Sequence, residues 1–473
     1  MTPIILAARS VAEKIKLEKK SEVLVVSHID ADGITSASIA TFVMENLGIE
    51  YQNFFVKNLD EDILQRIGDM GAELVWYTDI GSSVKDKIEG VSNQAIITDH
   101  HTVIQSRTKS NNGRVFELNP HNFGIDGGRE LSGSGITWIM AYAILGESVE
   151  RLVPLAVTGA VGDLQDNENR ALVGINKKIA DIGESAGYVK QVTDIFYYGK
   201  ETRPVYKMLQ YAFDPVIPGI SGNESAGIEF LTNLGVELRD DEGVWRSWVN
   251  LSGRERRLII SQIVRRILFS DCVPEDAVRV VGECYYFPLE HLGTEIHEAK
   301  EFATLLNACG RYGEAYIGLD VCLGDRGEAF RRARVLLRGH RRTLVESLDT
   351  VLRVIGIEEY GTLLYFHGGN KILDTIIGTL ASMLLNSGEI PTNKPIIAFA
   401  KNTEGKIKVS ARAPRPLINM GINLAQAVRI AADTVGGEGG GHSAAAGATI
   451  PEGAEDVFLR EVEKIINKQL GNG

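Results

Sequence analysis

Four short segments place carboxylates and imidazoles directly after runs of apolar residues. The most informative is Thr98–Thr102, which reads TDHHT and follows the apolar run Gln94–Ile97. The other three read SHIDADG at Ser27–Gly33, TDIG at Thr78–Gly81 and GAVGD at Gly159–Asp163. Carboxylates and imidazoles bind divalent cations, and ligands of open α/β sheets bind at the carboxyl ends of the strands. The four segments therefore predict a metal site at successive strand ends.

The spacing of the acidic residues favours two cations. His28, Asp30 and Asp32 alternate, and residues two apart on extended backbone point to the same side, so we expect them to converge. Asp79 stands alone and suits a carboxylate that bridges two ions, while Asp163 would complete the shell of one ion. Taken singly, Asp79 or Asp163 is better explained as a helix cap, but four such segments together favour the metal site.

Two divalent cations predict phosphoryl chemistry. Mixed carboxylate and imidazole shells suit Mn²⁺ or Zn²⁺ better than Ca²⁺. Two ions roughly 3.5–4 Å apart activate a water and stabilise both oxygens of an in-line displacement.

Composition limits the class of protein. At 473 residues the chain is longer than one hydrophobic core usually supports, so two or three domains are expected. The net charge of −12 argues against a protein that coats nucleic acid non-specifically, but not against a nuclease with local arginines. The four cysteines have no CxxC spacing, no apolar stretch is long enough for a membrane span, and the N-terminus suits an amphipathic helix rather than a signal peptide. These features predict a cytoplasmic protein that does not enter a membrane.

The elements that must position these residues follow from the apolar patterning. The first 200 residues alternate β-branched runs with helical patterns, which is typical of βαβ units and a parallel sheet. Strands are predicted at Val23–Ser27, Tyr51–Val56, Leu74–Thr78, Ala95–Thr98 and Val115–Leu118. Helices are predicted at Thr35–Leu47, Glu61–Met70 and Gly135–Leu145, the last with Ser134 as its N-cap.

The rest of the chain predicts a helical insertion and a second α/β unit. The insertion runs from about Tyr206 to Pro288, and helices follow at Glu295–Leu323 and Ala329–Val354. The final unit has predicted strands at Leu363–Phe366, Ile396–Ala400 and Ile407–Ala411 and a helix at Leu373–Asn386.

A glycine run near the C-terminus offers a phosphate site. Gly439, Gly440 and Gly441 precede His442, and successive backbone N–H groups without Cβ atoms can wrap an anion. The alternative is a flexible loop. Arg412 lies on a nearby strand and suits bidentate binding of phosphate; for Arg311 and Arg412 the alternative is an internal salt bridge.

The motifs HIDADG, TDIG, TDHH and TGAVGD resemble, in order and spacing, the four motifs of the DHH phosphoesterase superfamily. The segment Asn307–Arg311, NACGR, is similar to an element of RecJ-type exonucleases, and Gly439–His442 is similar to the GGGH signature of the accessory DHHA1 domain. With Asn167–Arg170 after the fourth motif, these features favour the RecJ branch. The chain most resembles the archaeal RecJ-like proteins, which include the GINS-associated nuclease (GAN).

The resemblance implies an α/β fold in two lobes with an interdomain cleft. A parallel-sheet DHH domain would occupy residues 1–205, and a mostly helical insertion that docks a partner would occupy residues 206–290. The NACGR element and a connecting helix would occupy 291–345, and a smaller α/β DHHA1 domain that binds substrate would occupy 346–473.

The resemblance also implies roles for single residues. One metal would be held by His28, Asp30 and Asp79, and the other by Asp32, Asp79, His100 and Asp163. The catalytic residues would be Asp163, His101 facing the substrate phosphate, and Asp99 orienting a neighbouring histidine. Substrate would be bound by Arg170, Arg311, Ser410, Arg412, Gly439, Gly440, Gly441 and His442.

The implied function is a two-metal exonuclease that degrades single-stranded DNA in the 5′→3′ direction, acts in replication and repair, and binds the GINS complex. The implied cofactor is a pair of Mn²⁺ ions, with Mg²⁺ or Zn²⁺ as alternatives. Other functions left open are a phosphodiesterase for RNA, oligoribonucleotides or cyclic dinucleotides, and a mainly structural replisome subunit. Contacts to the 2′ position decide between DNA and RNA, and no motif specifies them.

Overall fold

The computed structural model describes residues 2–15, 17–102, 113–270, 274–386, 390–391, 393–441 and 443–471. The chain forms two compact units. The first comprises Met1–Leu209 and Ser225–Leu337, and the second comprises Gln210–Glu224 and Arg338–Gly473. The interdomain cleft and the domain boundaries stay predictions.

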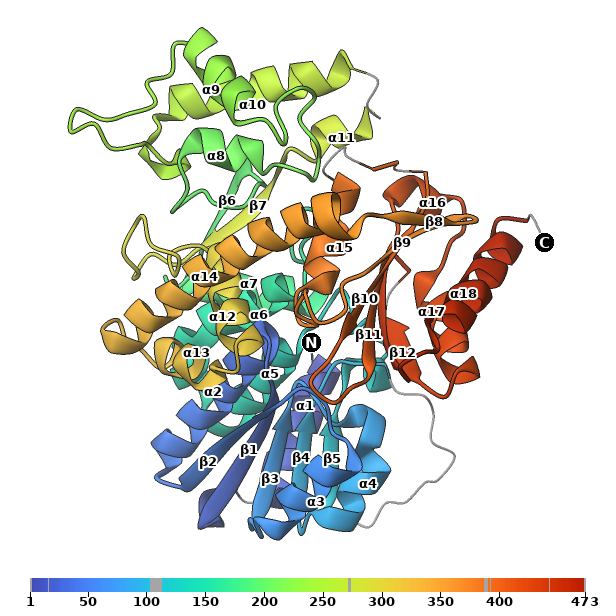
Figure 1. The fold of residues 1–473 in the computed structure, drawn as a ribbon. Helices are drawn as coiled ribbons and strands as arrows, with labels where there is room; N and C mark the ends of the chain where they lie inside the picture. Colours follow the sequence, from blue (N-terminus) through green and yellow to red (C-terminus); the bar gives the residue numbers. More distant parts are fainter. Residues whose placement is uncertain are drawn as a thin grey trace. The chain divides into compact units, whose positions relative to one another are not determined.

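The first unit is built on a five-stranded parallel sheet (Figure 1). Its strands run in the order β2-β1-β3-β4-β5. Their bounds are β1 Glu22–His28, β2 Glu50–Val56, β3 Leu74–Thr78, β4 Ala95–Thr98 and β5 Val115–Leu118. All five predicted strands are present, each within one residue of its predicted ends, and the predicted α/β fold is confirmed.

Helices cover both faces of this sheet because its central strands are apolar on both sides. Val23 and Val25 of β1 pack with α1 (Thr2–Ile15), α2 (Ala31–Leu47), α5 (Gly133–Leu145) and α6 (Val153–Gly162). Leu24 and Val26 pack with α3 (Glu61–Asp69) and α4 (Lys85–Val91). The period-two alternation of the strand thus sends successive side chains into two separate cores.

The strand order reverses at β1, because β2 lies on one side of it and β3 on the other. In sheets of this kind, such a switch point leaves room for a ligand beyond the carboxyl ends of the two diverging strands. His28 and Thr78 end β1 and β3, so the first two acidic segments both begin at this switch point.

The insertion is mostly helical, as predicted. The antiparallel pair β6 (Lys190–Ile195) and β7 (Val281–Tyr286) closes its base. Its helices are α8 Val205–Gln210, α9 Glu224–Asn233, α10 Gly253–Leu268 and α11 Glu275–Val278, and α7 (Gly174–Ser185) precedes it.

The helical segment predicted over Glu295–Leu323 is present as two helices. Helix α12 covers Ala299–Arg311 and α13 covers Ala315–Cys322. Between them Gly313 has φ +76°, a left-handed conformation that ends a helix and that glycine adopts without strain. The predicted arginine-bearing helix is present as α14, Glu328–Thr350.

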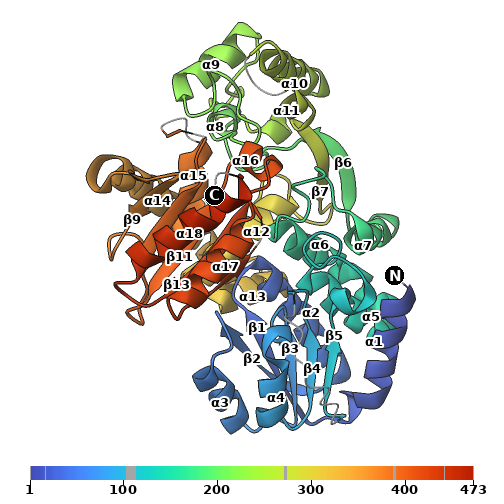
Figure 2. The same cartoon turned by 90° about the vertical axis from the view of Figure 1, so that its right-hand side faces the viewer.

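The second unit has a six-stranded sheet in the order β12-β13-β11-β10-β9-β8, in which only β9 and β10 are parallel neighbours (Figure 2). The strands are β8 Glu358–Tyr360, β9 Leu363–His367, β10 Ile396–Lys401, β11 Ile407–Arg412, β12 Glu438–Gly441 and β13 Ala445–Ile450. The helices are α15 Ile377–Asn386, α16 Arg415–Asn419, α17 Leu424–Thr434 and α18 Glu455–Gln469.

Two expectations for the second unit need correction. The helix predicted from Leu373 begins at Ile377. The glycine run is a strand at the edge of the sheet, because Gly439 and Gly440 pair with Ala448 and Gly447 of β13. No helix among the described residues is long and apolar enough to cross a membrane.

Candidate metal centre

The segment after β1 turns at once into helix α2. Asp30 is the N-cap of that helix, and its Oδ1 accepts from the backbone N–H of Gly33 at 2.9 Å. Its Oδ2 lies 2.9 Å from Nδ1 of His28. Asp32 is therefore in the first helical turn and not on extended backbone, which corrects the geometry expected for the alternating residues. His28 and Asp30 belong to one group of possible metal ligands and Asp32 belongs to another.

Asp79 stands between the two groups. Its φ of +58° places it in the left-handed region at the end of β3, which aspartate tolerates better than most residues. One carboxylate oxygen lies 3.7 Å from His28 Nδ1 and the other lies 3.2 Å from His100 Nε2. A Cβ at position 133 would come within 2.5 Å of Asp79 Oδ1, so only Gly133 lets α5 approach this carboxylate.

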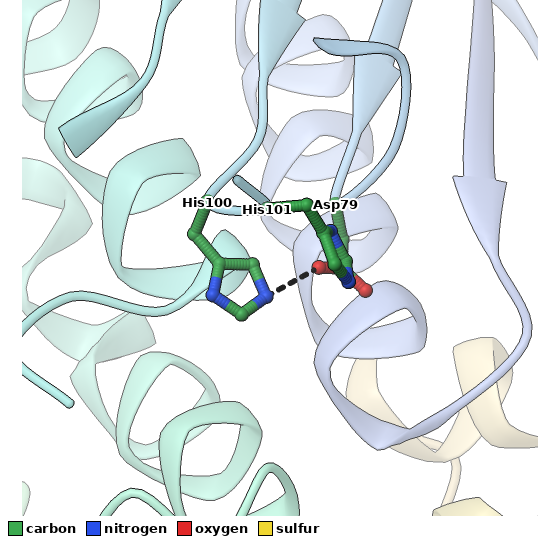
Figure 3. A group of neighbouring side chains, drawn as sticks. All are labelled: Asp79, His100 and His101. Atoms are coloured by element: carbon green, nitrogen blue, oxygen red, sulfur yellow. Dashed lines mark ion pairs between the residues drawn. The ribbon is translucent and has the colours of Figure 1, made fainter. Parts of the chain in front are cut away.

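His100 makes the densest contacts in the centre. Its Nδ1 donates to the carbonyl oxygen of Gly127 at 2.6 Å, which leaves Nε2 to face the carboxylates. That atom is 3.2 Å from oxygens of Asp79 and Asp163 and 3.7 Å from Asp32 Oδ2. Figure 3 shows the His100 ring directed at Asp79, with His101 beside them.

Asp99 forms a hydrogen bond with His101 and is not among the candidate metal ligands. Its Oδ1 accepts from Nδ1 of His101 at 2.7 Å, and its Oδ2 accepts from the backbone N–H of Ser82 at 2.8 Å. The His101 side chain is 57% exposed, so its ring reaches solvent while its position is fixed.

The buried carboxylate of Asp32 is anchored by the N-terminus of α5. Its two oxygens accept from the backbone N–H groups of Gly133 at 2.7 Å and Ser134 at 2.9 Å. The N-cap of α5 is Ser132 and not Ser134 as predicted, because the free N–H groups of the first turn serve this carboxylate. Asp163 approaches from the opposite direction as the C-cap of α6.

The excess of negative charge shifts the ionisation of Asp32, Asp163, His28 and His100. Burial, together with the charges of Asp79 and Asp163, raises the pKa of Asp32 well above its ordinary value. Burial also raises the pKa of Asp163. Burial alone would lower the pKa of His28 and His100, but neighbouring carboxylates raise both pKa values well above 6.5. Without cations, the cluster is stabilised by taking up protons.

Divalent cations fit this donor set. Among the described residues, three buried atoms that face the cluster have no hydrogen-bond partner: His28 Nδ1, Asp79 Oδ1 and His100 Nε2. Three groups have ligand atoms within 4.8 Å of one another: His28, Asp30 and Asp79; Asp32, His100 and Asp163; and Asp79, His100 and His101. Unpartnered buried imidazole and carboxylate atoms are costly unless an ion satisfies them. The sequence predicted all of these residues, although it assigned His101 to the substrate.

Helix α12 brings the NACGR element to the first acidic segment. Asn307 Oδ1 accepts from the backbone N–H of Ala31 at 2.9 Å. A Cβ at position 310 would lie 1.7 Å from the carbonyl oxygen of Ile29, so Gly310 is required for this approach. Burial lowers the pKa of Arg311, while the charge of Asp30 opposes that shift. Arg311 therefore lies within electrostatic reach of a predicted metal ligand.

The other predicted substrate residues make local contacts. Arg170 is buried with φ +54°, donates to Asn167 Oδ1 at 2.8 Å and stacks 4.6 Å from the ring centroid of Phe196. In the second unit, Arg412 donates to Ser382 Oγ at 3.0 Å and to the carbonyl of Ala411. Ser410 lies beside it on β11, and a Cβ on Gly378 would meet both side chains. Gly439–Gly441 form β12, and His442 lies outside the described residues.

Sequence reasoning missed the polar residues behind the ligands. Gln165, Asn176 and the carbonyl of Gly127 form hydrogen bonds around His100. Gln165 lies two residues after Asp163, which is a signal of position only, and Asn176 carries no signal in the sequence. Asn307 lay in a motif that had been noticed for its arginine.

The chain matches three protein families along its length. The DHH family N-terminal domain matches residues 22–160, the DHH-CID domain matches 197–281 and the DHHA1 domain matches 361–468. An uncharacterised protein of Methanocaldococcus jannaschii is 28% identical over 466 residues, which are 98% of this chain and 97% of that protein. The single-stranded-DNA-specific exonuclease RecJ of Bacillus subtilis is 25% identical over 179 residues, which are 35% of this chain and 22% of RecJ.

Solved structures share the fold at low sequence identity. RecJ of Thermus thermophilus in complex with Mn²⁺ has a TM-score of 0.57 and 17% identity, over 98% of this chain. This chain spans 55% of that RecJ chain. CDC45 of Entamoeba histolytica has a TM-score of 0.64 and 11% identity, over 98% of this chain and 99% of its own. These similarities establish a RecJ-like fold that CDC45 also has.

Proposed function

We propose that this chain, which matches the DHH, DHH-CID and DHHA1 domain models and has a RecJ-like fold, is a two-metal phosphodiesterase that degrades single-stranded DNA from the 5′ end. The observation that carries the proposal is the cluster of four aspartates and two imidazoles, of which Asp32, Asp79 and His100 are buried. In this cluster His28 Nδ1, Asp79 Oδ1 and His100 Nε2 have no hydrogen-bond partner among the described residues. Such an arrangement offers ligand atoms that two cations would occupy in place of the protons taken up without them.

In this proposal His28, Asp30 and Asp79 hold one ion, and Asp32, Asp79, His100 and Asp163 hold the other. When bound, the ions supply an activated water and stabilise the charge that develops on the scissile phosphate. The Gly127 carbonyl keeps His100 Nε2 directed at the carboxylates, and the N-terminus of α5 keeps Asp32 in place. We favour Mn²⁺ over Mg²⁺ or Zn²⁺ because the donor set mixes imidazole and carboxylate; RecJ of Thermus thermophilus has been solved with Mn²⁺ and with Mg²⁺.

His101 is proposed to donate to the substrate phosphate. Although burial opposes the shift, the hydrogen bond and charge of Asp99 raise the pKa of His101 to about 9. The imidazole of His101 therefore carries its proton at neutral pH and can donate to a phosphate oxygen or protonate a leaving oxygen.

Further phosphate contacts are assigned to arginine and to the second unit. Arg311 offers a guanidinium near Asp30, and Ser410, Arg412, Gly439–Gly441 and His442 are proposed to bind the nucleotide backbone. Arg170 is the weakest member of this set, because its guanidinium already contacts Asn167 and Phe196.

The proposal of single-stranded DNA rests on the relative that is named for this specificity, RecJ of Bacillus subtilis. The alternative substrates are RNA, oligoribonucleotides and cyclic dinucleotides, which the same chemistry would hydrolyse. We propose a cytoplasmic role in replication and repair.

The insertion is proposed to dock a replisome partner, namely the GINS complex. Its outer surface combines exposed apolar and basic side chains: Phe269 is 83% exposed and Val278 is 73% exposed, and Arg254 and Arg257 of α10 are exposed. Exposed side chains of these two kinds suit an acidic partner with apolar anchors. If purified GINS binds the wild type but not a Phe269→Ser/Arg257→Glu variant, this role is supported; equal binding of both proteins would refute it.

The nuclease proposal is tested with chelated protein to which metals are added back singly, on end-labelled single-stranded DNA and RNA. We expect Mn²⁺ to restore release of mononucleotides from the 5′ end of DNA, and Asp163→Ala to abolish it while the protein stays folded. Cleavage of short RNA alone would favour the oligoribonucleotide alternative, and Mn²⁺-dependent activity in Asp163→Ala would refute the assigned centre.

A further inference from the structure

We infer that Gln165 and Asn176 are positioning residues that fix His100, Asp32 and Asp163 relative to one another. The inference rests on the proposed function, because it assigns a role toward the same metal centre. Both side chains are almost completely buried, at 4% and 2% exposure.

The two side chains form a continuous chain of hydrogen bonds. The backbone N–H of Ser132 donates to Asn176 Oδ1 at 3.3 Å, and Asn176 Nδ2 donates to Gln165 Oε1 at 2.5 Å. Gln165 Nε2 then donates to the carbonyl oxygen of Gly127 at 2.9 Å. That same carbonyl oxygen accepts from His100 Nδ1 at 2.6 Å.

Backbone groups at both ends fix the donor-to-acceptor direction of this series of hydrogen bonds. A backbone N–H can only donate and a carbonyl oxygen can only accept, so neither amide can be flipped without setting like groups against each other. Since the Gly127 carbonyl accepts from two donors, His100 must carry its proton on Nδ1. When a cation displaces the second proton of the imidazole, Nε2 offers its lone pair to that cation.

The chain of hydrogen bonds joins three of the four acidic segments. Ser132 is the N-cap of α5, whose next two N–H groups hold the carboxylate of Asp32. Gln165 is two residues beyond Asp163, and Gly127 contacts the ring of His100. The candidate ligands Asp32 of α2, His100 after β4 and Asp163 at the end of α6 are thus linked through one pair of buried amide side chains.

Two substitutions interrupt this path at different points. Gln165→Leu removes the link to Gly127. Asn176→Asp keeps the acceptor for Ser132 but places a carboxylate against Gln165 Oε1, so the two acceptors repel. Asn176→Asp also adds negative charge, which by itself would favour cation binding, so weaker binding cannot be explained by charge.

The test is Mn²⁺ binding by calorimetry to the metal-free full chain, with the thermal midpoint in EDTA as the measure of folding. We expect both variants to bind Mn²⁺ about 10–100-fold more weakly at one site, which is the range for residues behind metal ligands. Asn53→Leu is the matched control: it removes a buried amide that accepts from Thr41 Oγ1 at 3.1 Å, in strand β2. The control should lower the thermal midpoint but keep wild-type Mn²⁺ affinity.

The outcomes separate this inference from the proposal beneath it. Wild-type Mn²⁺ affinity in both folded variants would overturn the inference and leave the metal centre intact. An equal loss of affinity in Asn53→Leu would also overturn it, because general destabilisation would then explain the effect. A wild-type chain that binds no Mn²⁺ would overturn the proposed function and this inference together.

Discussion

Two buried clusters of charge in the first unit differ in how completely their members are paired. In the Lys200 cluster (Lys200, Glu201, His297, Glu298 and Glu301), Lys200 Nζ lies 3.0 Å from Glu298 Oε1, and His297 Nδ1 lies 2.8 Å from Glu201 Oε1. Glu301 accepts from the backbone N–H of Glu201 at 2.7 Å. In the metal centre, by contrast, three atoms facing the cluster have no hydrogen-bond partner among the described residues.

Under the proposed function, this difference separates a structural cluster from a functional one. A buried ion pair keeps its place when its hydrogen bonds are complete, as around Lys200. A buried group of like charges persists only when something outside the protein neutralises it. The Lys200 cluster joins the base of the insertion to the start of α12, whereas the metal centre is assembled from four loop and helix ends.

The strongest way to break this comparison is to remove the shared carboxylate of the metal centre. We expect Asp79→Asn to lower kcat by at least about 10³-fold, equivalent to about 4 kcal/mol of barrier, because both ions lose a ligand. Asparagine also tolerates the left-handed backbone at this position, so the fold should survive. In EDTA the free energy of unfolding should be unchanged or higher, since one buried like charge is gone. Turnover within about tenfold of wild type would contradict the assignment.

The opposite result is expected for the Lys200 cluster. Lys200→Met leaves Glu298 charged and unpaired in the interior, which should lower the free energy of unfolding by about 3–5 kcal/mol. Urea denaturation measures the change, and the double variant Lys200→Met/Glu298→Gln should recover part of it. If the single variant is as stable as the wild type, the buried ion pair between Lys200 and Glu298 does not stabilise the fold as proposed.

Cations should stabilise one cluster only. A ligand at 100 times its Kd stabilises the folded state by about 2.7 kcal/mol, so Mn²⁺ should raise the melting temperature and EDTA should reverse the increase. Lys200→Met should respond to Mn²⁺ as the wild type does, from a lower starting temperature. A melting temperature of Asp79→Asn that rises as much as the wild type's would count against the centre.

A partly exposed pair on the insertion provides the smallest effect. The Arg246 side chain lowers the pKa of Glu255 from 4.5 to about 2. Because the folded-state pKa is depressed, the pair adds stability above pH 4.5 and loses it as the pH falls toward 2. Near the surface this amounts to no more than about 1 kcal/mol. Arg246→Gln should show that loss at pH 7 and a flatter stability profile between pH 5 and 2; an unchanged profile would refute the contribution.

The sequence predicted the metal centre better than its surroundings for a physical reason. His28, Asp79 and His100 follow strands of a parallel sheet, and the topology alone brings strand ends together. Gln165 and Lys200 have no such periodic context, since their roles depend on partners distant along the chain, such as Gly127 and Glu298.

Backbone details were less predictable. Asp32 lies on helix α2 because the side chain of Asp30 caps that helix two residues earlier. The glycine run forms strand β12 because it pairs with β13. Both outcomes depend on competition between local turns and tertiary contacts. The strands themselves were predictable, because a short continuous apolar run bounded by polar residues forms few structures other than a buried strand in a chain of this composition.

The most direct test of the central claim is an electron paramagnetic resonance titration of the metal-free chain with Mn²⁺. If Asp79 joins two adjacent sites, two ions should bind per chain and give the spectrum of a spin-coupled pair, and Asp79→Asn should abolish the coupling. A single uncoupled ion per chain, or a spectrum that is the same in Asp79→Asn, would contradict the account.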